Sequence, residues 1–378
     1  MAAIIERPDA SQVVTFDQNK ATPRWLGTIG HVTALKYSYA CPGGCDQMSA
    51  TLQISARERT DAMNPGRLVS IVRGASTVWR GKLDEPQPTP SGWSITAHGA
   101  GTYGADFSAI YTGTWGTGTP DNAVNAAITR GLDWNNPGIG SPSGMWTGQP
   151  VDSGAQQITD LLNLICTKGG LTWYVATRPT KNVLSVLTLP TTVTNLLVSN
   201  TPVARTLGGD TNTIWLRYQS AGDTTTPATY DTTSVTDAAS IAAYGAMETY
   251  ADLSSAGTMT ASAACAVGNL VLQRYQRASF AGPFVAGPGQ LLTTGGAPVD
   301  LGAGMPYAPM VCRLVLTDFG YGGEEVPGAV QFLVGAYEYD DDAQQATVTP
   351  FQYLATNFSS LLSNLVTAAT TVPAPSKH

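Results

Sequence analysis

The sequence has 378 residues, of which 43% are hydrophobic and only 12% are charged, and its formal net charge at pH 7 is −7. This acidic balance argues against a nucleic-acid-binding surface, but it leaves open a conduit that nucleic acid passes through without sticking, because an acidic wall repels phosphate. No run of 18 apolar residues and no apolar leader occur, and the five cysteines are scattered. We therefore expect no membrane insertion, no secretory signal and no disulfide framework.

Alternation of apolar and polar residues predicts strands at Gln12–Phe16, His31–Tyr39 and Gln47–Ala56, with a turn at Cys41–Cys45. The stretch Gly66–Gly99 then predicts three further strands. Forty glycines and 24 prolines mark many bends along the chain. The first hundred residues hold enough β-structure for a small, closed or nearly closed sheet.

The three strands of the stretch 66–99 are Leu68–Val72, Thr77–Arg80 and Trp93–Ala97. A tight turn joins the first two, and Gly81 lets the second bend and run on to the acidic pair Asp84-Glu85. Valine, isoleucine, tryptophan and threonine suit a pleated, half-buried surface, which supports the strand prediction.

Residues 101–200 predict a compact α+β unit. Asp121 is placed to cap a short helix that ends at Thr129, and Ser153 is placed to cap a longer one. The longer helix carries Ile158, Leu161, Leu162 and Ile165 at helical spacing. The strands Leu171–Ala176 and Val183–Leu189 follow it.

After a strand pattern at residues 203–220, Asp237 is placed to cap another helix, and Thr260–Tyr275 predicts a second. The pattern of 66–99 returns near the C-terminus at Val311–Leu316, Phe332–Asp340 and Ala346–Thr349. In both places a strand ends in an apolar residue, glycine, two further residues and an acid. We interpret the two stretches as copies of one β-barrel unit.

The predicted fold class is α+β, mainly β, with two β-barrel domains and two inserted α+β or helical domains. The predicted domains are a first barrel (1–100), an inserted α+β domain (101–200), a second barrel (201–232 and 293–350), a helical insert (233–292) and a C-terminal helix and tail (351–378).

Short runs of this sequence resemble minor tail proteins of actinobacterial siphophages. The runs are Pro42–Ser49 (PGGCDQMS), Val78–Gly81 (VWRG), Trp93–Gly99 (WSITAHG), Leu333–Asp340 (LVGAYEYD) and Ala346–Pro350 (ATVTP). The order of barrel, insert, half-barrel, insert and half-barrel is also similar to the tail-tip (baseplate) hub family of long-tailed phages.

The resemblance implies a homotrimer at the distal end of a phage tail, made in the host cytoplasm. Each subunit would contribute two barrels, so that six barrels join a six-fold tail tube to a three-fold tip around a channel for DNA ejection. The implied partners are a distal tail protein, a tape-measure protein, tail fibre or receptor-binding proteins, and DNA as passing cargo. A structural role without cofactor, metal or catalysis is expected.

Candidate chemical sites are few. His31 and His98 lie in strand patterns, His378 is terminal, and none has metal-ligand spacing. Cys41 and Cys45 flank a Pro-Gly-Gly turn as ordinary turn residues or, alternatively, as a disulfide formed after virion release. The run Asp340–Asp342 favours a hairpin turn over a cation site, because the spacing and glycine of a calcium loop are missing.

No nucleophile motif or phosphate-binding loop occurs, and Asp210, Glu248 and Asp300 are isolated carboxylates. We instead predict an assembly interface from aromatic and arginine residues of the two repeated stretches. Its residues are Arg67, Trp79, Arg80, Trp93, Arg313, Tyr337 and Tyr339. The loop tryptophans Trp115, Trp134 and Trp146 either close the core of the α+β insert or anchor a partner.

Two alternatives remain. A carbohydrate-binding tail adhesin or depolymerase-like tail spike would stack sugars on the loop tryptophans and cleave glycosidic bonds with acidic residues. It predicts a repetitive β-helical or lectin-like segment, which the sequence lacks. A tail-tube or distal-tail ring protein predicts six subunits with one barrel each, against the two copies seen here.

Overall fold

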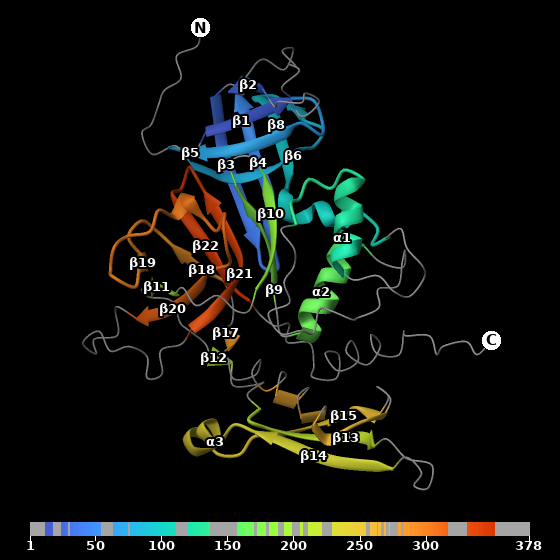
Figure 1. The fold of residues 1–378 in the computed structure, drawn as a ribbon. Coiled ribbons are helices and arrows are strands. Elements are labelled where there is room, and N and C mark those ends of the chain that lie inside the picture. The colour runs from blue at the N-terminus through green and yellow to red at the C-terminus, as the bar shows by residue number, and fades with distance from the viewer. Residues whose placement is uncertain are drawn as a thin grey trace, which may run out of the picture. The chain divides into compact units, whose positions relative to one another are not determined.

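The computed structural model describes two compact units, which are treated separately here (Figure 1). Unit 1 comprises Met1–Thr201, Gly282–Ala329 and Leu333–Pro350, and unit 2 comprises Pro202–Ala281, Val330–Phe332 and Phe351–His378. The residues that the structure describes are 12–17, 24–28, 31–53, 63–74, 76–110, 120–136, 157–169, 172–178, 181–187, 193–198, 205–206, 211–220, 229–254, 258–262, 264–265, 268–269, 272, 279–280, 283–316 and 331–351.

Unit 1 is built on a 16-stranded sheet that curls at both ends. Along its main path the strands run β19 (Leu291–Thr293), β11 (Val193–Val198), β20 (Val311–Leu316), β21 (Gln331–Asp340), β3 (His31–Ala40), β4 (Gly43–Gln53), β8 (Gly92–Gly99), β6 (Ser76–Leu83), β5 (Leu68–Arg73), β1 (Gln12–Asp17) and β2 (Arg24–Thr28). Beside this path lie β7 (Gln87–Thr89), β9 (Thr172–Thr177), β10 (Asn182–Leu187), β18 (Phe284–Ala286) and β22 (Gln345–Pro350).

The strands predicted from alternation in unit 1 are confirmed, and their alternation matches their burial. On β4, Met48, Ala50 and Leu52 are buried, whereas Gln47 and Ser49 between them are exposed. Ile54, predicted on the same face, lies outside the described residues. Five strands of this sheet were not predicted from alternation, namely β2, β7, β11, β18 and β19.

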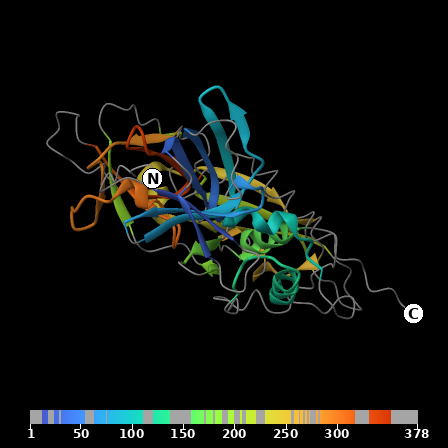
Figure 2. The same ribbon diagram turned by 90° about the horizontal axis from the view of Figure 1, so that it is seen from above.

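The N-terminal and C-terminal strands meet where β3 pairs with β21. The pairing is antiparallel, with Ala40 opposite Ala336, Tyr39 opposite Tyr337 and Lys36 opposite Asp340. Figures 1 and 2 show the N-terminal strands, coloured blue to cyan, beside the C-terminal strands, coloured orange to red. The two stretches that the sequence repeats therefore lie in one continuous sheet.

Helices pack beside β9 in unit 1. They are the 3₁₀ helix η2 (Ala100–Asp106), α1 (Pro120–Thr129) and α2 (Ile158–Gly169). Ile158, Leu161 and Leu162 of α2 are buried in one cluster with Trp134 and Trp173. The amphipathic pattern predicted for α2 is thus confirmed.

The predicted start of α1 needs correction. Asp121 lies in the first turn of α1, and the helix begins one residue earlier, at Pro120. Proline suits the first helical position because its fixed φ is already helical and its missing N–H has no partner there. The carboxylate of Asp121 still lies at the favourable, positive end of the helix. Ser153, the predicted cap of α2, lies outside the described residues.

Unit 2 has a four-stranded sheet of its own. Its central strand β13 (Thr213–Ser220) pairs with β14 (Tyr230–Thr236) on one side and with β15 (Glu248–Asp252) and β16 (Thr258–Met259) on the other. The prediction divided these residues at position 232, but the structure groups them in one sheet. The domain boundaries as a whole stay a prediction.

The remaining elements of unit 2 are short. The helix α3 (Ala238–Tyr244) begins after Asp237, whose carboxylate accepts hydrogen bonds from the N–H groups of Ala239 and Ser240, as predicted. The strands β12 (Arg205–Thr206) and β17 (Ser279–Phe280) form a separate pair. No helix in the described parts of the chain is long and apolar enough to cross a membrane.

Candidate functional site

Four tyrosines fill the junction between β3 and β21. Tyr37 lies against Tyr339 with ring centroids 5.4 Å apart, and Tyr39 lies 6.2 Å from Tyr337. All four rings are buried. The hydroxyl of Tyr337 donates to the carbonyl of Leu301 at 2.6 Å, in the short 3₁₀ helix η4 (Leu301–Ala303). Aromatic packing and buried hydrogen bonds therefore hold the two groups of strands together.

Arg73, at the end of β5, reaches across this junction. Its guanidinium contacts Asp300 at 2.9 Å and Asp341 at 3.1 Å, and it lies 5.4 Å from the ring centre of Tyr339. Burial alone would lower the pKa of Arg73. The hydrogen bond with Asp300 and the electrostatic interactions with Tyr37, Asp300 and Tyr339 raise the pKa above its usual value. The Arg73 cluster, defined as Arg73, Asp300, Tyr339 and Asp341, joins three segments that are distant in sequence.

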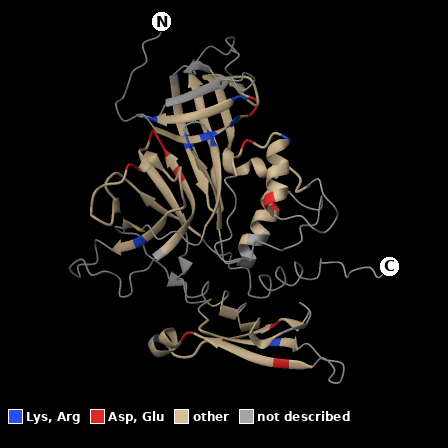
Figure 3. Ribbon diagram, in the orientation of Figure 1, with Lys and Arg blue, Asp and Glu red and all other residues tan. Residues whose placement is uncertain are grey.

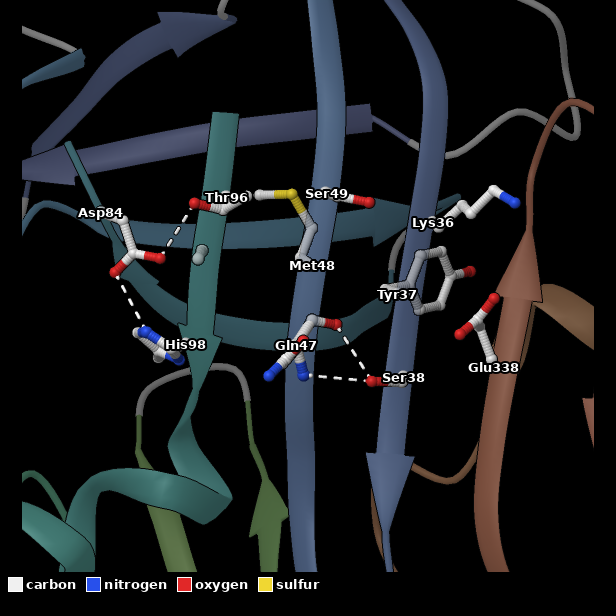
Figure 4. Close-up of a pocket in the computed structure, with 11 residues that line it drawn as sticks. Lys36, Tyr37, Ser38, Gln47, Met48, Ser49, Asp84, Thr96, His98 and Glu338 are labelled. Atoms are coloured by element: carbon white, nitrogen blue, oxygen red, sulfur yellow. Dashed lines mark hydrogen bonds and ion pairs between the residues drawn. The ribbon is translucent and has the colours of Figure 1, made fainter. Parts of the chain in front are cut away.

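A polar cavity of about 300 Å³ crosses the solvent side of the same strands (Figure 4). It is open and shallow, and its walls come from β21, β3, β4 and β8 and from the segment after β6. The lining residues are Lys36, Tyr37, Ser38, Gln47, Met48, Ser49, Asp84, Thr96, Ala97, His98 and Glu338.

Strand register places the polar side chains of this cavity in rows. Gln47 of β4 lies opposite His98 of β8, and Ser49 lies opposite Thr96. On the other side, Ser38 of β3 lies opposite Glu338 of β21. Because directly opposed residues point to the same face, period-two patterns on four strands give one polar surface.

Most charges on this surface are paired within it. The hydroxyl of Thr96 donates to Asp84 at 3.0 Å, and His98 Nε2 lies 3.4 Å from the same carboxylate, so that protonated His98 forms an ion pair (Figure 4). Lys36 Nζ lies 2.9 Å from Asp340. The hydrogen bond with Asp340 raises the pKa of Lys36.

Asp340 also shapes the turn between β21 and β22. Its carboxylate accepts hydrogen bonds from the N–H groups of Asp342 and Ala343. Partial burial raises the pKa of Asp340, but these backbone bonds and Lys36 outweigh burial and lower it overall. The hairpin turn predicted at Asp340–Asp342 is confirmed, with residues 341–344 forming it.

The cavity offers hydrogen-bonding and charged side chains from several strands. The hydroxyl of Thr96 donates to Asp84 and not to His98, so no hydroxyl is held for deprotonation by the imidazole. Among the described residues, no group of three histidine, cysteine or acidic side chains is placed to hold a metal ion. Charged residues are sparse on the strands of both units, as Figure 3 shows.

The residues predicted for an assembly interface are mostly inside the subunit. Trp79, Arg80, Trp93, Tyr337 and Tyr339 are buried. Two of them, Tyr337 and Tyr339, come together at the junction, and Trp79 donates its indole N–H to the carbonyl of Ser38 nearby. Arg67 and Arg313 are half-buried. Their role in assembly stays a prediction.

The predicted loop tryptophans can be placed in part. Trp134 is buried, lies 6.0 Å from Trp173 between ring centroids, and donates its indole N–H to Ala100 O at 2.7 Å. Trp134 therefore closes the core of the α+β region, which was the first of its two predicted roles. Trp115 and Trp146 lie outside the described residues.

The other candidates of the sequence are structural. Cys41 and Cys45 are free and buried, and their sulfurs lie 3.5 Å and 3.1 Å from the hydroxyls of Thr172 and Thr177. Burial raises the pKa of each thiol to about 11. His98 is exposed on β8, and His31 lies on β3.

The three isolated carboxylates have separate places. Asp300 pairs with Arg73, Glu248 is exposed on β15, and Asp210 lies outside the described residues. The sequence patterns did not predict the contacts of Arg73 and Lys36 or the contact between Asp84 and His98, because the partner of each residue lies in another segment of the chain. The tight turn predicted beside Arg73 was the only sequence feature that drew attention to any of these residues.

Three solved structures have a similar fold. They are a prophage MuSo2 43 kDa tail protein from Shewanella oneidensis (TM-score 0.54, 14% identity, 89% of this chain and 97% of that one), prophage tail protein gp18 from Listeria monocytogenes EGD-e (0.56, 11%, 95% and 99%), and a tail protein from Neisseria meningitidis MC58 (0.52, 12%, 90% and 95%).

At these identities the likeness shows a shared fold. It spans nearly the whole of each chain, so both units have counterparts in these tail proteins. No protein-family model and no curated protein sequence matches this chain.

Proposed function

We propose that this chain is a structural protein of a phage tail. The observation that carries the proposal is the fold, which is shared with three prophage tail proteins over 89–95% of this chain. A likeness of this extent includes residues of both units.

More specifically, we propose a trimeric hub at the distal tip of the tail. Two repeated stretches of strands in one subunit, 66–99 and 311–349, would provide the two tube-like parts of the subunit. Because β3 pairs with β21, N-terminal and C-terminal strands lie in one sheet. This pairing supports two tube-like parts that lie side by side. Three such subunits would present six units to a six-fold tube.

The polar surface around the cavity suits the wall of a channel for DNA. Lys36 is paired with Asp340, and the only other cationic candidate lining the cavity, His98, lies beside Asp84. A phosphate backbone passing this surface would find few free cations to bind, so its movement would not be slowed by strong electrostatic attraction. The proposed neighbours are a distal tail protein, a tape-measure protein and tail fibre or receptor-binding proteins.

Size-exclusion chromatography with light scattering tests the oligomeric state. The proposed trimer should have three times the mass of the 39.4 kDa chain. A chain that stays monomeric at high concentration, and that also fails to join purified tails lacking it, would overturn the proposal.

A further inference from the structure

The sheet of unit 2 has one covered face and one open face. On β13, Ile214, Leu216 and Tyr218 are buried, whereas Trp215 and the residues alternating with it point to the other side. The buried side chains form a core with Val235, Ala251, Leu253, Ala264 and Leu272. The apolar side chains of this sheet are therefore packed in a core on one side only.

Helical residues of the segment 261–272 cover the buried face closely. A Cβ added at Gly268 would lie 2.5 Å from Leu216 Cδ1, so the helical backbone lies directly on the strand. The hydroxyl of Thr233 also lies 3.3 Å from Cys265 Sγ. These contacts fix which face of the sheet is packed and which is presented to solvent.

Strand register gathers three aromatic rings on the open face. Trp215 lies opposite Tyr250 of β15, and Tyr230 of β14 lies opposite Gln219. The exposed fractions are 42% for Trp215, 54% for Tyr250 and 59% for Tyr230. They are half of the six large hydrophobic side chains that are exposed among the described residues. Single exposed hydrophobic residues are ordinary, but a group on one face indicates a binding site.

Arg217 stands between these rings with its charge already matched. Its guanidinium lies 4.4 Å from the ring centre of Tyr230 and 3.4 Å from the carboxylate of Asp252. The positive charge of the guanidinium and the negative charge of the carboxylate cancel. The solvent-facing atoms of both groups can still form hydrogen bonds. A ligand of this face is therefore not selected by net charge, which disfavours phosphate-bearing and strongly acidic polymers.

Hydroxyl and amide groups fill the spaces between the rings. Ser234 lies opposite Trp215, Thr232 lies opposite Arg217, and Gln219 follows along β13. This alternation of ring faces with neutral donors and acceptors differs from a protein hot spot, in which aromatic residues fill a desolvated pocket. It resembles what a chain of sugar rings needs, because each sugar has an apolar C–H face and a rim of hydroxyl groups.

We propose that this open face of unit 2 binds a neutral polysaccharide. The sugar-binding face, as we name it, consists of Trp215, Arg217, Gln219, Tyr230, Thr232, Ser234, Tyr250 and Asp252. Sugar rings stack on the three aromatic side chains, while Arg217, Asp252 and the hydroxyl groups bond to sugar hydroxyls. An open sheet face suits an extended polymer, which needs no deep pocket. This activity is independent of the proposed role in the tail hub.

Affinity electrophoresis of the full chain tests the proposal. Native gels would contain hydroxyethyl cellulose, dextran, galactomannan or no polysaccharide, and bovine serum albumin would serve as the mobility standard. At least one polysaccharide is expected to retard the protein. Trp215→Ala and Tyr250→Ala should each weaken binding about two- to tenfold, as expected for the loss of one stacked ring, and the double variant should weaken it further.

A matched control is Tyr307→Ala in unit 1. Tyr307 is 44% exposed and also lies beside an arginine, with Arg178 5.1 Å from its ring centre, but it lies outside the sugar-binding face. This variant should bind as the wild type does. Trp215→Tyr, which keeps a ring, should retain most of the binding, and circular dichroism should show that every variant is folded.

Hydroxyl-radical footprinting with mass spectrometry identifies the occupant of the face. The bound polysaccharide should protect Trp215 from oxidation. Absence of retardation by all three polysaccharides, or equal retardation of wild type and double variant, would overturn the proposal. Protection of Trp215 by self-association alone, without polysaccharide binding, would overturn it in favour of a protein interface. The retardation results do not bear on the mass measured by light scattering, so the hub proposal is judged separately.

Discussion

Arg73 and Asp341 lie 3.1 Å apart, although 268 residues separate them in the chain. Arg73 ends a strand of the first repeated stretch, and Asp341 begins the turn after a strand of the second. Their side chains are 9% and 14% exposed, so the pair is largely shielded from water and salt. This contact, with the β3–β21 pairing, makes one folded body of two segments near opposite ends of the sequence.

Arg73→Met should destabilise unit 1 by about 1–3 kcal/mol. The substitution keeps much of the side-chain volume but removes the cation beside Asp341, whose side chain is 14% exposed, and beside the more exposed Asp300. The loss of a cation costs most at the buried carboxylate. Urea unfolding measures the change. Arg178→Met is a suitable control, since Arg178 is exposed and stacks on an exposed ring. Equal effects of the two substitutions would contradict a special role for the Arg73 cluster.

Asp340→Asn should reduce stability by about 0.5–1 kcal/mol at neutral pH, through loss of the charge that faces Lys36 and the turn N–H groups. In the folded state, the turn N–H groups and Lys36 hold the pKa of Asp340 below its usual value. The stabilisation is therefore present above the pKa of the unfolded state and lost as pH falls through the folded pKa.

Urea unfolding of wild type and Asp340→Asn over a pH series checks this dependence. The two curves of unfolding free energy against pH should lie apart at neutral pH and converge in acid. A gap that stays constant down to the lowest pH would show that Asp340 acts through shape alone.

Gly81→Ala should cost more than about 2 kcal/mol. An added Cβ would collide with the carbonyl of His98 on β8 and with the ring of Trp79, and a backbone carbonyl in a sheet has little room to move. Gly295→Ala provides the control, because its Cβ would meet only Thr293 Oγ1 at 3.8 Å. Thermal unfolding should separate the two variants clearly. A Gly81→Ala protein as stable as the control would show that the close approach is relieved by small shifts.

The cysteines should differ in reactivity toward iodoacetamide at pH 8. Burial raises the pKa of Cys41 and Cys45 to about 11 and that of Cys166 and Cys312 to about 12, so the reactive thiolate is scarce as well as covered. Cys265 is only partly buried. Mass spectrometry of the labelled native protein should find Cys265 modified first. Rapid labelling of Cys41 or Cys45 would contradict their burial beside Thr172 and Thr177.

Local patterns predicted much of the secondary structure. Period-two alternation is a property of each strand by itself, so β3, β4, β5 and β21 could be placed from sequence. Asp237 could be assigned as a helix cap because it bonds to N–H groups two and three residues away. Prediction succeeded where cause and effect lie within a few residues.

Pairings between distant segments could not be predicted in this way. Nothing local in β3 indicates that β21 will be its neighbour, and nothing beside Arg73 names Asp300 and Asp341 as its partners. The same limit applies to aromatic residues. Trp79, buried in unit 1, and Trp215, exposed in unit 2, both lie in predicted strands, and only the tertiary fold decides which face is covered.

Electron cryomicroscopy of the purified oligomer tests the central claim most directly. A trimeric hub should give class averages with three-fold symmetry, in which six barrel-like densities surround a central channel. The polar surface with Lys36, Gln47 and His98 should face that channel. A six-fold ring with one density from each subunit would contradict the hub assignment. So would a closed three-fold particle in which this surface faces outward.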